Sequence, residues 1–433
     1  MKRSLIVASL SALTCGQLAY AQDYNAINES VNDNIVEAGD VLAIALPATG
    51  LFASLIHQDL EGAAQLTISV LAAQGITEVT KNTVGRYRPN SDLAGASYKS
   101  FPSGHAAGAF SGAAFLQTRY GAAWGIPAYA AATFVAASRV HGNRHYADDV
   151  LGGASIGFLV NQLVVSPYVK EGVSLTAGPS SDGGVMFGVS VTDKALQYDQ
   201  GRKRGTGKLP KQNRHRFQFD VGFNMTDSVD QMDDHDLLPG SKLVDDHQPF
   251  SSVIYEYTID NKTSVEFSLM PSETRRYGTA NGDFSVDNTT YSQGSDIYLA
   301  FKQWSAGGTY YHHYQINDKL NLSAGVGLYG FLVELEADHL RGGNYASEGG
   351  YQFMPSVTGK AQYKLIGDLY LQGLANYQTW GNDQIGYVEA GFNYAVNKDW
   401  ELGLKYTMSR NEWRDVGVKH QTNAVVLSFA NRF

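Results

Sequence analysis

Cysteine is almost absent from this chain of 433 residues, in which Cys15 is the only one. It lies in a segment with two early cations, Lys2 and Arg3, a short apolar stretch at residues 5–13 and an A-x-A sequence at residues 19–21, which together are typical of a cleaved signal peptide. We expect residues 1–21 to be removed, which takes the formal net charge from −9 to −11 and leaves no thiol. Disulfides and cysteine catalysis are then excluded. A lipoprotein cysteine at Cys15 is the alternative, although the residues before it match a lipobox poorly.

Charged residues are also scarce, at 17% of the chain, and acids outnumber bases. This balance argues against a general nucleic-acid-binding protein, because such proteins need a surplus of cations. Tyrosine and glycine, in contrast, are plentiful, with 26 and 46 residues. That composition suits a β-rich membrane or surface domain in part of the chain.

Long uninterrupted apolar runs are missing from residues 28–170, although this part is rich in alanine, glycine and leucine. Its apolar stretches predict helices at residues 41–57, 63–73, 105–118, 122–138 and 150–169. Pro47, Pro127 and Asn161 interrupt these stretches, and alanine and glycine make them only marginally apolar on an insertion scale. We therefore predict a bundle of buried helices, with an integral membrane protein as the alternative.

Two short segments separate the helices from the rest of the chain. Residues 174–191 predict a β-hairpin that turns at residues 181–184. Residues 196–213 predict an extended basic linker, because seven cations and no acid lie between Arg202 and Arg216, together with glycines and Pro210. The linker is either simply solvated or in contact with anionic lipid headgroups.

From about residue 214 the apolar pattern changes to a period of two, which is typical of strands. In residues 320–328 and 401–409, for example, apolar side chains alternate with small or polar ones. A sheet in lipid must close on itself, since lipid offers no hydrogen bonds. We therefore predict an all-α helical domain followed by an antiparallel transmembrane β-barrel, with a soluble β-sandwich as the alternative to the barrel.

Turns and loops predict the number of strands. Tight polar turns at residues 260–262, 317–319, 366–368 and 397–399 alternate with longer loops near 227–248, 274–293, 336–348, 380–384 and 411–420. This asymmetry matches the periplasmic and extracellular ends of outer-membrane barrels and gives about ten strands, with eight or twelve as alternatives. The last strand has an apolar face that resembles the assembly signal of bacterial outer-membrane proteins, formed by Val425, Leu427, Phe429 and the terminal Phe433.

Three short segments of the helical region carry residues suited to catalysis. The first runs from Lys81 to Pro89 and reads K-x6-R-P, the second reads P-S-G-H at residues 102–105, and the third reads S-R-x5-H-x3-D at residues 138–149. A phosphoryl group in transfer spreads negative charge over three oxygens, so its catalysis requires positioned cations and hydrogen-bond donors. The segments supply such groups to bind a substrate phosphate, namely Lys81, Arg88, Ser103, Gly104 and Arg139.

In order and spacing these segments resemble the three signature motifs of the type 2 phosphatidic acid phosphatase family, which is related to bacterial acid phosphatases and vanadium haloperoxidases. The resemblance covers roughly residues 30–170 and meets all eight defining positions: Lys81, Arg88, Pro89, Ser103, His105, Arg139, His145 and Asp149. It implies that His145 attacks phosphorus and forms a phosphohistidine, and that His105 protonates the leaving oxygen and then activates water. Asp149 lies one helical turn after His145, where it can hold the far imidazole nitrogen.

Metal binding is an alternative for parts of this pattern. The i, i+4 spacing of His141, His145 and Asp149 can bind zinc. A zinc or two-metal phosphatase should bring more carboxylates, however, and arginines surround this site instead. Seven aspartates between Asp227 and Asp246 could bind calcium, but their spacing fits no EF-hand and favours a solvated extracellular loop. We expect no cofactor, and vanadate as an inhibitor.

The sequence thus predicts four parts: a signal peptide at 1–21, a helical phosphatase domain at 22–195, the basic linker at 196–213 and an outer-membrane barrel at 214–433. We expect a metal-independent phosphoric ester hydrolase, with its helical domain in the periplasm of a Gram-negative bacterium. Its expected partners are a phosphorylated lipid substrate, outer-membrane lipids and the barrel assembly machinery. The alternatives are a pore or transporter with an inactive helical domain, and a vanadium-dependent haloperoxidase. His312, His313 and Lys405 are candidate parts of a second catalytic site in the barrel.

Overall fold

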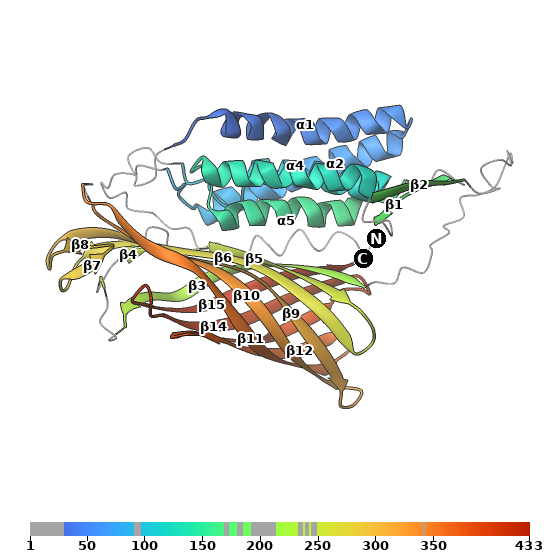
Figure 1. The fold of residues 1–433 in the computed structure, drawn as a ribbon. Helices are drawn as coiled ribbons and strands as arrows, with labels where there is room; N and C mark the ends of the chain where they lie inside the picture. The colour runs from blue at the N-terminus through green and yellow to red at the C-terminus, as the bar shows by residue number, and fades with distance from the viewer. Residues whose placement is uncertain are drawn as a thin grey trace.

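The computed structural model describes residues 30–90, 97–168, 173–179, 185–191, 214–232, 237–238, 242–243, 249–340 and 343–433, with the backbone alone for 173–179, 185–191 and 242–243. The predicted signal peptide, the basic linker and much of the acidic loop lie outside these ranges, so those predictions stay untested. The described residues form a helical bundle and a β-barrel that lie side by side (Figure 1).

In the described part of the chain, five helices make up the bundle, at the places that the apolar stretches predicted. They are α1 (Asn34–Ile56), α2 (Leu60–Val84), α3 (Gly104–Tyr120), α4 (Ala122–His141) and α5 (Ala147–Val164). Asp33 begins α1 by accepting hydrogen bonds from the backbone amides of Ile35 and Val36. The central helix is α3, which packs against the other four helices and buries its alanines.

Small residues bring α3 and α5 close together. A methyl group added at Gly153 would lie 2.1 Å from the carbonyl oxygen of Ser103, and one added at Gly157 would lie 2.5 Å from that of Ala107. Neither substitution fits unless the backbone moves, so glycine sets the spacing of these helices. The close approach places the beginning of α3 beside the beginning of α5, where the second and third motifs lie.

One face of the bundle is apolar and exposed. Among the described helices, α1 is the one that is long and apolar enough to cross a membrane by length and composition. It lies on the side of the bundle away from the barrel (Figure 1). The large apolar side chains that α1 and α2 expose include Val41, Ile44, Phe52, Leu55, Leu60 and Leu71.

Several short strands lie outside the barrel wall. β1 (Val173–Pro179) and β2 (Val185–Val191) pair antiparallel, which confirms the predicted hairpin. β4 (Lys242–Leu243) pairs with the edge of a barrel strand, and β7 (Phe284–Val286) pairs with β8 (Thr289–Tyr291) in a second hairpin.

The barrel wall consists of ten long strands, as predicted. They are β3 (His215–Gln231), β5 (Pro249–Thr258), β6 (Thr263–Thr279), β9 (Asp296–Gln315), β10 (Leu320–His339), β11 (Ala346–Ile366), β12 (Leu369–Trp380), β13 (Asp383–Ala395), β14 (Trp400–Trp413) and β15 (Val418–Arg432). Neighbouring strands are antiparallel, and the pairing of β6 with β9 closes the sheet. The soluble sandwich alternative is therefore wrong.

The two ends of the barrel differ in part as the turns predicted, but the predicted longer loops near 380–384 and 411–420 are wrong, because only two residues join β12 to β13 and four join β14 to β15. At most four residues join β5 to β6, β9 to β10, β11 to β12 and β13 to β14, whereas the connections at the other end include the longer loops. The barrel also begins and ends on the short-turn side, where the backbones of His215 and Phe433 exchange hydrogen bonds of 3.3 and 2.9 Å. Short turns and chain ends face the periplasm in outer-membrane barrels.

The outer wall of the barrel changes character along its length. In β10 the outward side chains Val326 and Leu328 are exposed and apolar, whereas Glu334 follows toward the long loops. In β6 the exposed Leu269 is followed in the same way by Glu273. The apolar part is of the kind that contacts lipid. We call it the apolar belt, and it includes Phe267, Leu269, Tyr310, Tyr314, Leu322, Val326, Leu328, Phe353, Val357 and Tyr363.

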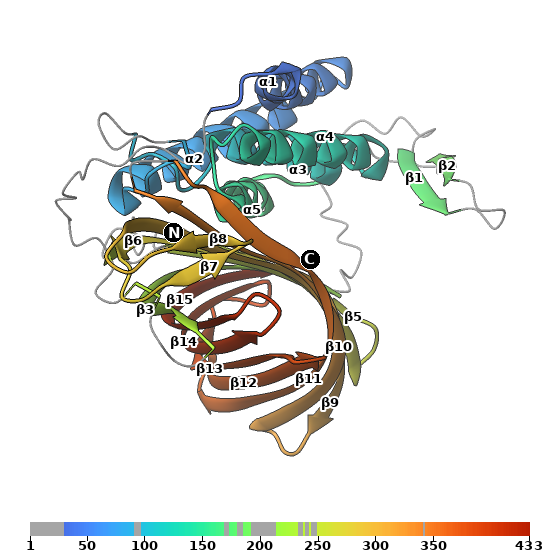
Figure 2. The same ribbon diagram turned by 60° about the vertical axis from the view of Figure 1, so that its left-hand side comes forward.

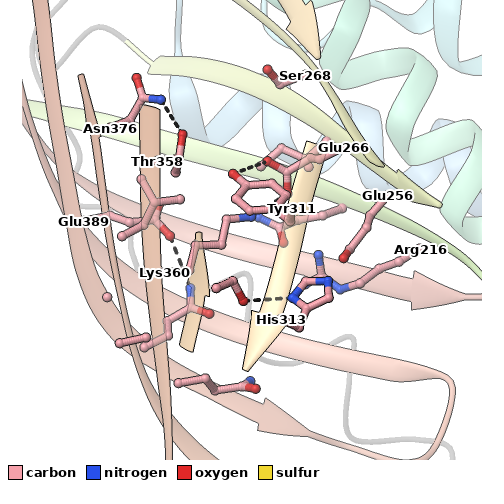
Figure 3. A pocket seen from close by; sticks show the side chains of 18 of the residues that line it. Arg216, Glu256, Glu266, Ser268, Tyr311, His313, Thr358, Lys360, Asn376 and Glu389 are labelled. Carbon is pink, nitrogen blue, oxygen red and sulfur yellow. Dashed lines mark hydrogen bonds and ion pairs between the residues drawn. The ribbon is translucent and has the colours of Figure 1, made fainter. Parts of the chain in front are cut away.

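The lumen of the barrel holds two different environments. Its long-loop half is filled by a cluster of buried apolar side chains, among them Phe331, Trp413 and, from the β7–β8 hairpin, Tyr291. We call this cluster the apolar plug. The short-turn half contains a polar cavity of about 1000 Å³, in which cations pair with acids, as Lys360 does with Glu266 (Figure 3). The plug closes the long-loop side of this cavity.

The bundle lies along the outer wall of the barrel, with α5 next to β3, β5 and β6 (Figures 1 and 2). At the short-turn end, the ring of Phe158 packs against those of Phe217 and Phe433, with centroids 4.6 and 5.8 Å apart. Farther along the wall, the carbonyl oxygen of Asp148 accepts a hydrogen bond of 2.7 Å from the hydroxyl of Ser251 in β5. The helix therefore follows the wall from one end of the barrel toward the other.

Because the apolar plug fills the lumen, we expect the purified protein to show no stepwise ion conductance in planar lipid bilayers. As a comparison, a variant that lacks residues 282–293 would lose the β7–β8 hairpin and with it Phe284 and Tyr291. That variant should conduct more than the intact protein. Stable channels formed by the intact protein would contradict this packing and support the pore alternative.

Candidate active site

The three motifs lie at helix ends on one side of the bundle. The first spans the end of α2, where Gly85 adopts a left-handed φ of 66° and turns the chain away from the helix. The second begins α3, which has Ser103 as its N-cap, and the third spans the end of α4 and the start of α5. The second and third motifs are joined directly, because the amide of Ser103 donates a hydrogen bond of 2.8 Å to the carbonyl oxygen of Asp149.

His145, the predicted nucleophile, is buried beside Asp149. Its Nδ1 lies 3.4 Å from Oδ2 of Asp149, which is long for a hydrogen bond but within ion-pair distance. Burial lowers the pKa of His145 to about 4, although the Asp149 carboxylate acts in the opposite direction. The imidazole is therefore neutral at pH 7. With Nδ1 facing a carboxylate, the proton belongs on Nδ1 and the lone pair on Nε2.

Asp149 has more partners than the sequence predicted. Its carboxylate accepts hydrogen bonds from Ser100 Oγ at 2.5 Å, Arg86 Nη1 at 2.9 Å and the Tyr146 amide at 2.9 Å. Burial alone would raise the pKa of Asp149, but the Arg86 charge, the neighbouring His145 and the hydrogen bond from Ser100 hold it below its usual range. Sequence reasoning missed Arg86 and Ser100. Arg86 lies inside the first motif, yet its spacing does not show that it turns toward acids.

Arg86 also pairs with Asp148, a second buried acid that the sequence did not single out. Both carboxylate oxygens of Asp148 accept from Arg86 Nη1 at 2.8 Å. Burial and the neighbouring Asp149 raise the pKa of Asp148. One guanidinium thus holds two adjacent acids at the start of α5, and the start of this helix itself favours negative charge.

Lys81 and Arg88, two of the predicted phosphate-binding cations, lie close to the histidines. Lys81 is buried, and its Nζ donates a hydrogen bond of 3.3 Å to the carbonyl oxygen of Lys99. Desolvation and then the charge of Arg88 lower the pKa of Lys81, and desolvation and then the charge of Arg144 lower that of Arg88. A bound anion would relieve this repulsion between cations.

The start of α3 supplies the predicted neutral donors. Ser103 is fully buried at the N-cap, and Gly104 is the first residue of the helix. A methyl group added at Gly104 would lie 4.0 Å from Nζ of Lys81, so the backbone at this helix start faces the lysine ammonium. Free amides at the beginning of a helix attract anions, and the glycine leaves room for one to approach.

Arg139, the third predicted cation, contacts an acid that sequence reasoning missed. Its Nη1 donates a hydrogen bond of 2.5 Å to Oδ1 of Asp40 in α1, and its Nη2 donates one of 2.6 Å to the carbonyl oxygen of Val36. The same Oδ1 of Asp40 lies 3.2 Å from Nε2 of His105. Asp40 therefore joins the predicted acid–base histidine to a predicted phosphate ligand. No signal in the sequence marked it, because a lone acid in an apolar helix belongs to no motif.

The environment of His105 suits a group that exchanges protons. Desolvation and then the charge of Arg139 lower the pKa of His105, whereas Asp40 raises it. The side chain is about half exposed, at 47%, so solvent and a substrate can reach it. His105 can thus exchange a proton with solvent and with a substrate.

His141 does not join the site. Its Nε2 lies 2.8 Å from Oδ2 of Asp33 at the start of α1, so the three residues of the predicted zinc spacing do not converge. Within the ranges that the structure describes, no group of three or more histidines, cysteines and acids is arranged to hold a metal ion. Of the acidic segment, Asp227 points into the barrel and pairs with Arg276 at 2.8 Å.

The candidate residues of a second site, His312, His313 and Lys405, all line the polar cavity of the barrel, but they have different partners there. His313 lies between two hydroxyls, with Ser264 Oγ 2.9 Å from Nε2 and Ser323 Oγ 2.8 Å from Nδ1. The dashed line at His313 in Figure 3 marks one of these contacts. Lys405 is buried and pairs instead with Asp220 at 3.1 Å. These contacts do not bring the histidine pair and the lysine together as one catalytic group.

Comparison with known proteins identifies the helical domain. The family model of the PAP2 superfamily matches residues 62–171. The chain is 31% identical over 177 residues to the lipid A 4′-phosphatase of Helicobacter pylori, a match that covers 38% of this chain and 89% of that protein. It is 39% identical over 92 residues to the lipid A 1-phosphatase of Porphyromonas gingivalis, which covers 21% of this chain and 20% of that protein. The chain thus spans only about a fifth of the length of this second relative.

Solved structures resemble each part of the chain separately. Aquifex aeolicus LpxE matches with a TM-score of 0.26 and 21% identity, over 31% of this chain and 87% of that one. The Escherichia coli outer-membrane protease OmpT matches with a TM-score of 0.31 and 10% identity, over 53% of this chain and all of that one. These similarities are too low to carry an argument about function.

Fold and site together define the class of protein. A closed antiparallel barrel with an apolar outer belt is the architecture of outer-membrane proteins, and it lies here beside a helical domain with the three motifs of a phosphatase. The chain belongs to the PAP2 superfamily. The resemblance predicted from the three motifs is confirmed.

The contact between Asp40 and His105 leads to a prediction on pH dependence. Because Asp40 raises the pKa of His105, Asp40→Asn should lower that pKa further. His105 then loses its proton at a lower pH. The alkaline limb of kcat/KM should therefore move toward lower pH, and activity near pH 7.5 should drop several-fold. The same change removes a negative charge beside Arg139, so orthovanadate should inhibit the variant at lower concentration.

Asp33→Asn is a matched control, because it alters another acid of α1 that pairs with a histidine outside the site. This control should keep the wild-type pH profile. An alkaline limb that stays in place in Asp40→Asn, or moves to higher pH, would contradict the role of Asp40.

Proposed function

We propose that the protein is a metal-independent phosphatase that hydrolyses a phosphate ester of a lipid through a phosphohistidine at His145. The observation that carries this proposal is the convergence of the three motifs on one buried group. His145 and Asp149 of the third motif lie beside the N-cap of the second, and Lys81 and Arg88 of the first motif lie within electrostatic reach of both. Membership in the PAP2 superfamily supports the same chemistry.

The proposed reaction has two steps. In the first, Nε2 of His145 attacks phosphorus and the bond to the leaving oxygen breaks, while His105 gives that oxygen a proton. In the second, His105 takes a proton from water, whose oxygen attacks the phosphohistidine and releases inorganic phosphate. Asp149 holds Nδ1 of His145 and stabilises the positive charge that develops on the ring. Lys81, Arg88 and the start of α3 bind the phosphoryl oxygens.

A lipid phosphate fits the surroundings of the site better than a freely diffusing ester. Both curated relatives described above are named as lipid A phosphatases. In this chain the helical domain packs on the wall of a membrane barrel, and it carries exposed apolar side chains on α1 and α2. We propose that the substrate is a phosphorylated membrane lipid of the lipid A class, which reaches the site by moving laterally beside the barrel.

The position of α5 on the barrel wall bears on the side of the membrane at which the site opens. The sequence predicted the periplasmic face, which is the face of the short turns. The catalytic end of α5 lies instead farther from the short turns, where Asp148 contacts Ser251 near the start of β5 and Tyr146 contacts Arg275 of β6. At the level of Arg275 the outer wall is charged, because Glu273, Lys302 and Glu334 face outward there, beyond the apolar belt. We therefore propose that the site opens at the long-loop edge of the belt, in place of the periplasmic face.

The mechanism predicts how substitutions and inhibitors act on phosphate release. His145→Ala should abolish turnover, because no other group forms the covalent intermediate. His105→Ala should lower kcat by about 10²–10⁴-fold through loss of general acid–base catalysis. Orthovanadate should inhibit and EDTA should not. The measurement is phosphate release by detergent-purified protein from a phosphorylated lipid and from a small soluble ester. Loss of activity in EDTA that a divalent cation restores would rule out the metal-independent mechanism.

The orientation can be tested with single cysteines, since the only native cysteine lies in the predicted signal peptide. Asn82→Cys places a thiol on the exposed side of α2 beside Lys81, Gly282→Cys places one in a long loop and Asp318→Cys one in a short turn. A membrane-impermeant maleimide should label Asn82→Cys and Gly282→Cys in intact cells. It should label Asp318→Cys only after the outer membrane is permeabilised. If Asn82→Cys follows Asp318→Cys, the periplasmic prediction is right and the proposed orientation is wrong.

A further inference from the structure

The loop that carries His145 touches the barrel as well as the rest of the bundle. Residues 145–149 lie against the long-loop ends of β5 and β6, so the barrel wall forms one side of the third motif. None of the three motifs that predict the phosphatase includes a barrel residue. The contacts are therefore specific to this arrangement of a helical domain beside a barrel.

The first contact involves the ring of Tyr146, directly after His145. The guanidinium of Arg275 in β6 lies 4.4 Å from the centroid of this ring, and that of Arg86 lies 4.0 Å from it. Cations at such distances over an aromatic ring are attracted by its electrons, more strongly where water is excluded. Tyr146, Arg86 and Arg275 are all buried, so the tyrosine ring joins a barrel cation to the first motif.

The second contact is a hydrogen bond to the backbone. Ser251 in β5 is fully buried, and its hydroxyl donates a hydrogen bond of 2.7 Å to the carbonyl oxygen of Asp148. Asp148 precedes Asp149, whose carboxylate accepts from the Tyr146 amide and lies beside Nδ1 of His145. A shift of the backbone at residue 148 would therefore change the distance between the nucleophile and its carboxylate.

These contacts explain why β6 carries charged residues on its outward face. Glu266 and Ser268 line the lumen, so the alternate residues Glu273 and Arg275 face outward. An outward charge on a barrel is costly where lipid covers it. Here Glu273 Oε1 pairs with Arg275 at 2.6 Å, and Glu273 is near enough to Arg86 for their charges to attract. The helical domain covers this pair, which therefore forms part of an interface.

We propose that Arg275, Glu273 and Ser251 of the barrel are positioning residues of the phosphatase, which hold the loop of His145 in its catalytic geometry. They do not touch the substrate, and they act through Tyr146 and the backbone of Asp148. The barrel is then a component of the active enzyme in addition to a membrane anchor. This inference rests on the proposed role of His145 as the nucleophile.

The chain offers a closely matched pair of variants to test this inference. Arg275 and Arg276 are adjacent in β6, are both buried and each form an ion pair with an acid. Arg275 faces outward to Tyr146, whereas Arg276 faces inward to Asp227. Arg275→Gln therefore disturbs the contact with the catalytic loop, and Arg276→Gln disturbs the barrel to a comparable extent without that contact.

The measurement is steady-state hydrolysis of a small soluble phosphate ester by the full chain in detergent. Arg275→Gln should lower kcat roughly 10- to 100-fold, because misplacement by a fraction of an ångström to 1 Å is costly for a nucleophile. Its KM should change little, since the phosphate-binding cations remain. Ser251→Ala should lower kcat in the same way, and Arg275→Lys should recover part of the loss because it keeps a cation over the ring. Arg276→Gln should keep the wild-type kcat.

Two further readouts separate the outcomes. Mobility of unheated protein on gels reports whether the barrel of each variant is closed, and only variants with a closed barrel are compared. If His145→Ala retains turnover, the proposed function itself is wrong. If His145→Ala is inactive but Arg275→Gln and Ser251→Ala have the wild-type kcat, the role of the barrel is refuted. An equal loss of kcat in Arg276→Gln would also refute it, because the effect would then follow barrel damage in general.

Discussion

Asp149 is completely buried, and all three catalytic motifs meet at it. Its carboxylate accepts hydrogen bonds from Arg86 of the first motif and from Ser100, and it lies 3.4 Å from Nδ1 of His145. Its backbone carbonyl accepts from the amide of Ser103 in the second motif. A buried carboxylate is stable only when charges and donors surround it. The need to satisfy this one acid therefore fixes the relative positions of the helix ends that form the site.

The same constraint extends into the barrel. Arg86 must face Asp148 and Asp149 at once, and the ring of Tyr146 covers its guanidinium. The barrel approaches this group with Arg275 and Ser251, and so adds contacts on the side that the bundle leaves uncovered. Close packing of α3 and α5 through Gly153 keeps the opposite side in place. The site is thus enclosed by two domains whose folds have nothing in common.

The barrel itself combines two kinds of interior. Its long-loop half is packed with apolar side chains such as Phe331 and Trp413, in the manner of a soluble protein core. Its short-turn half holds paired charges such as Lys360 and Glu266 around a cavity. A lumen closed in this way fits a barrel that supports a second domain better than one that transports a solute.

The sequence by itself determined much of this protein. Its helices, strands and catalytic motifs follow from patterns among residues that are close together in the chain. The period of two and the tight turns predicted ten strands, apolar stretches predicted five helices, and motif spacing placed Asp149 beside His145. Tertiary structure alone decided that Asp40 joins His105 to Arg139, that Arg86 turns to Asp149, and that Arg275 lies over Tyr146. It also decided that the bundle lies along the barrel wall. Such contacts join residues distant in the chain, and they depend on which faces of two separately folded domains meet, which no local pattern of residues encodes.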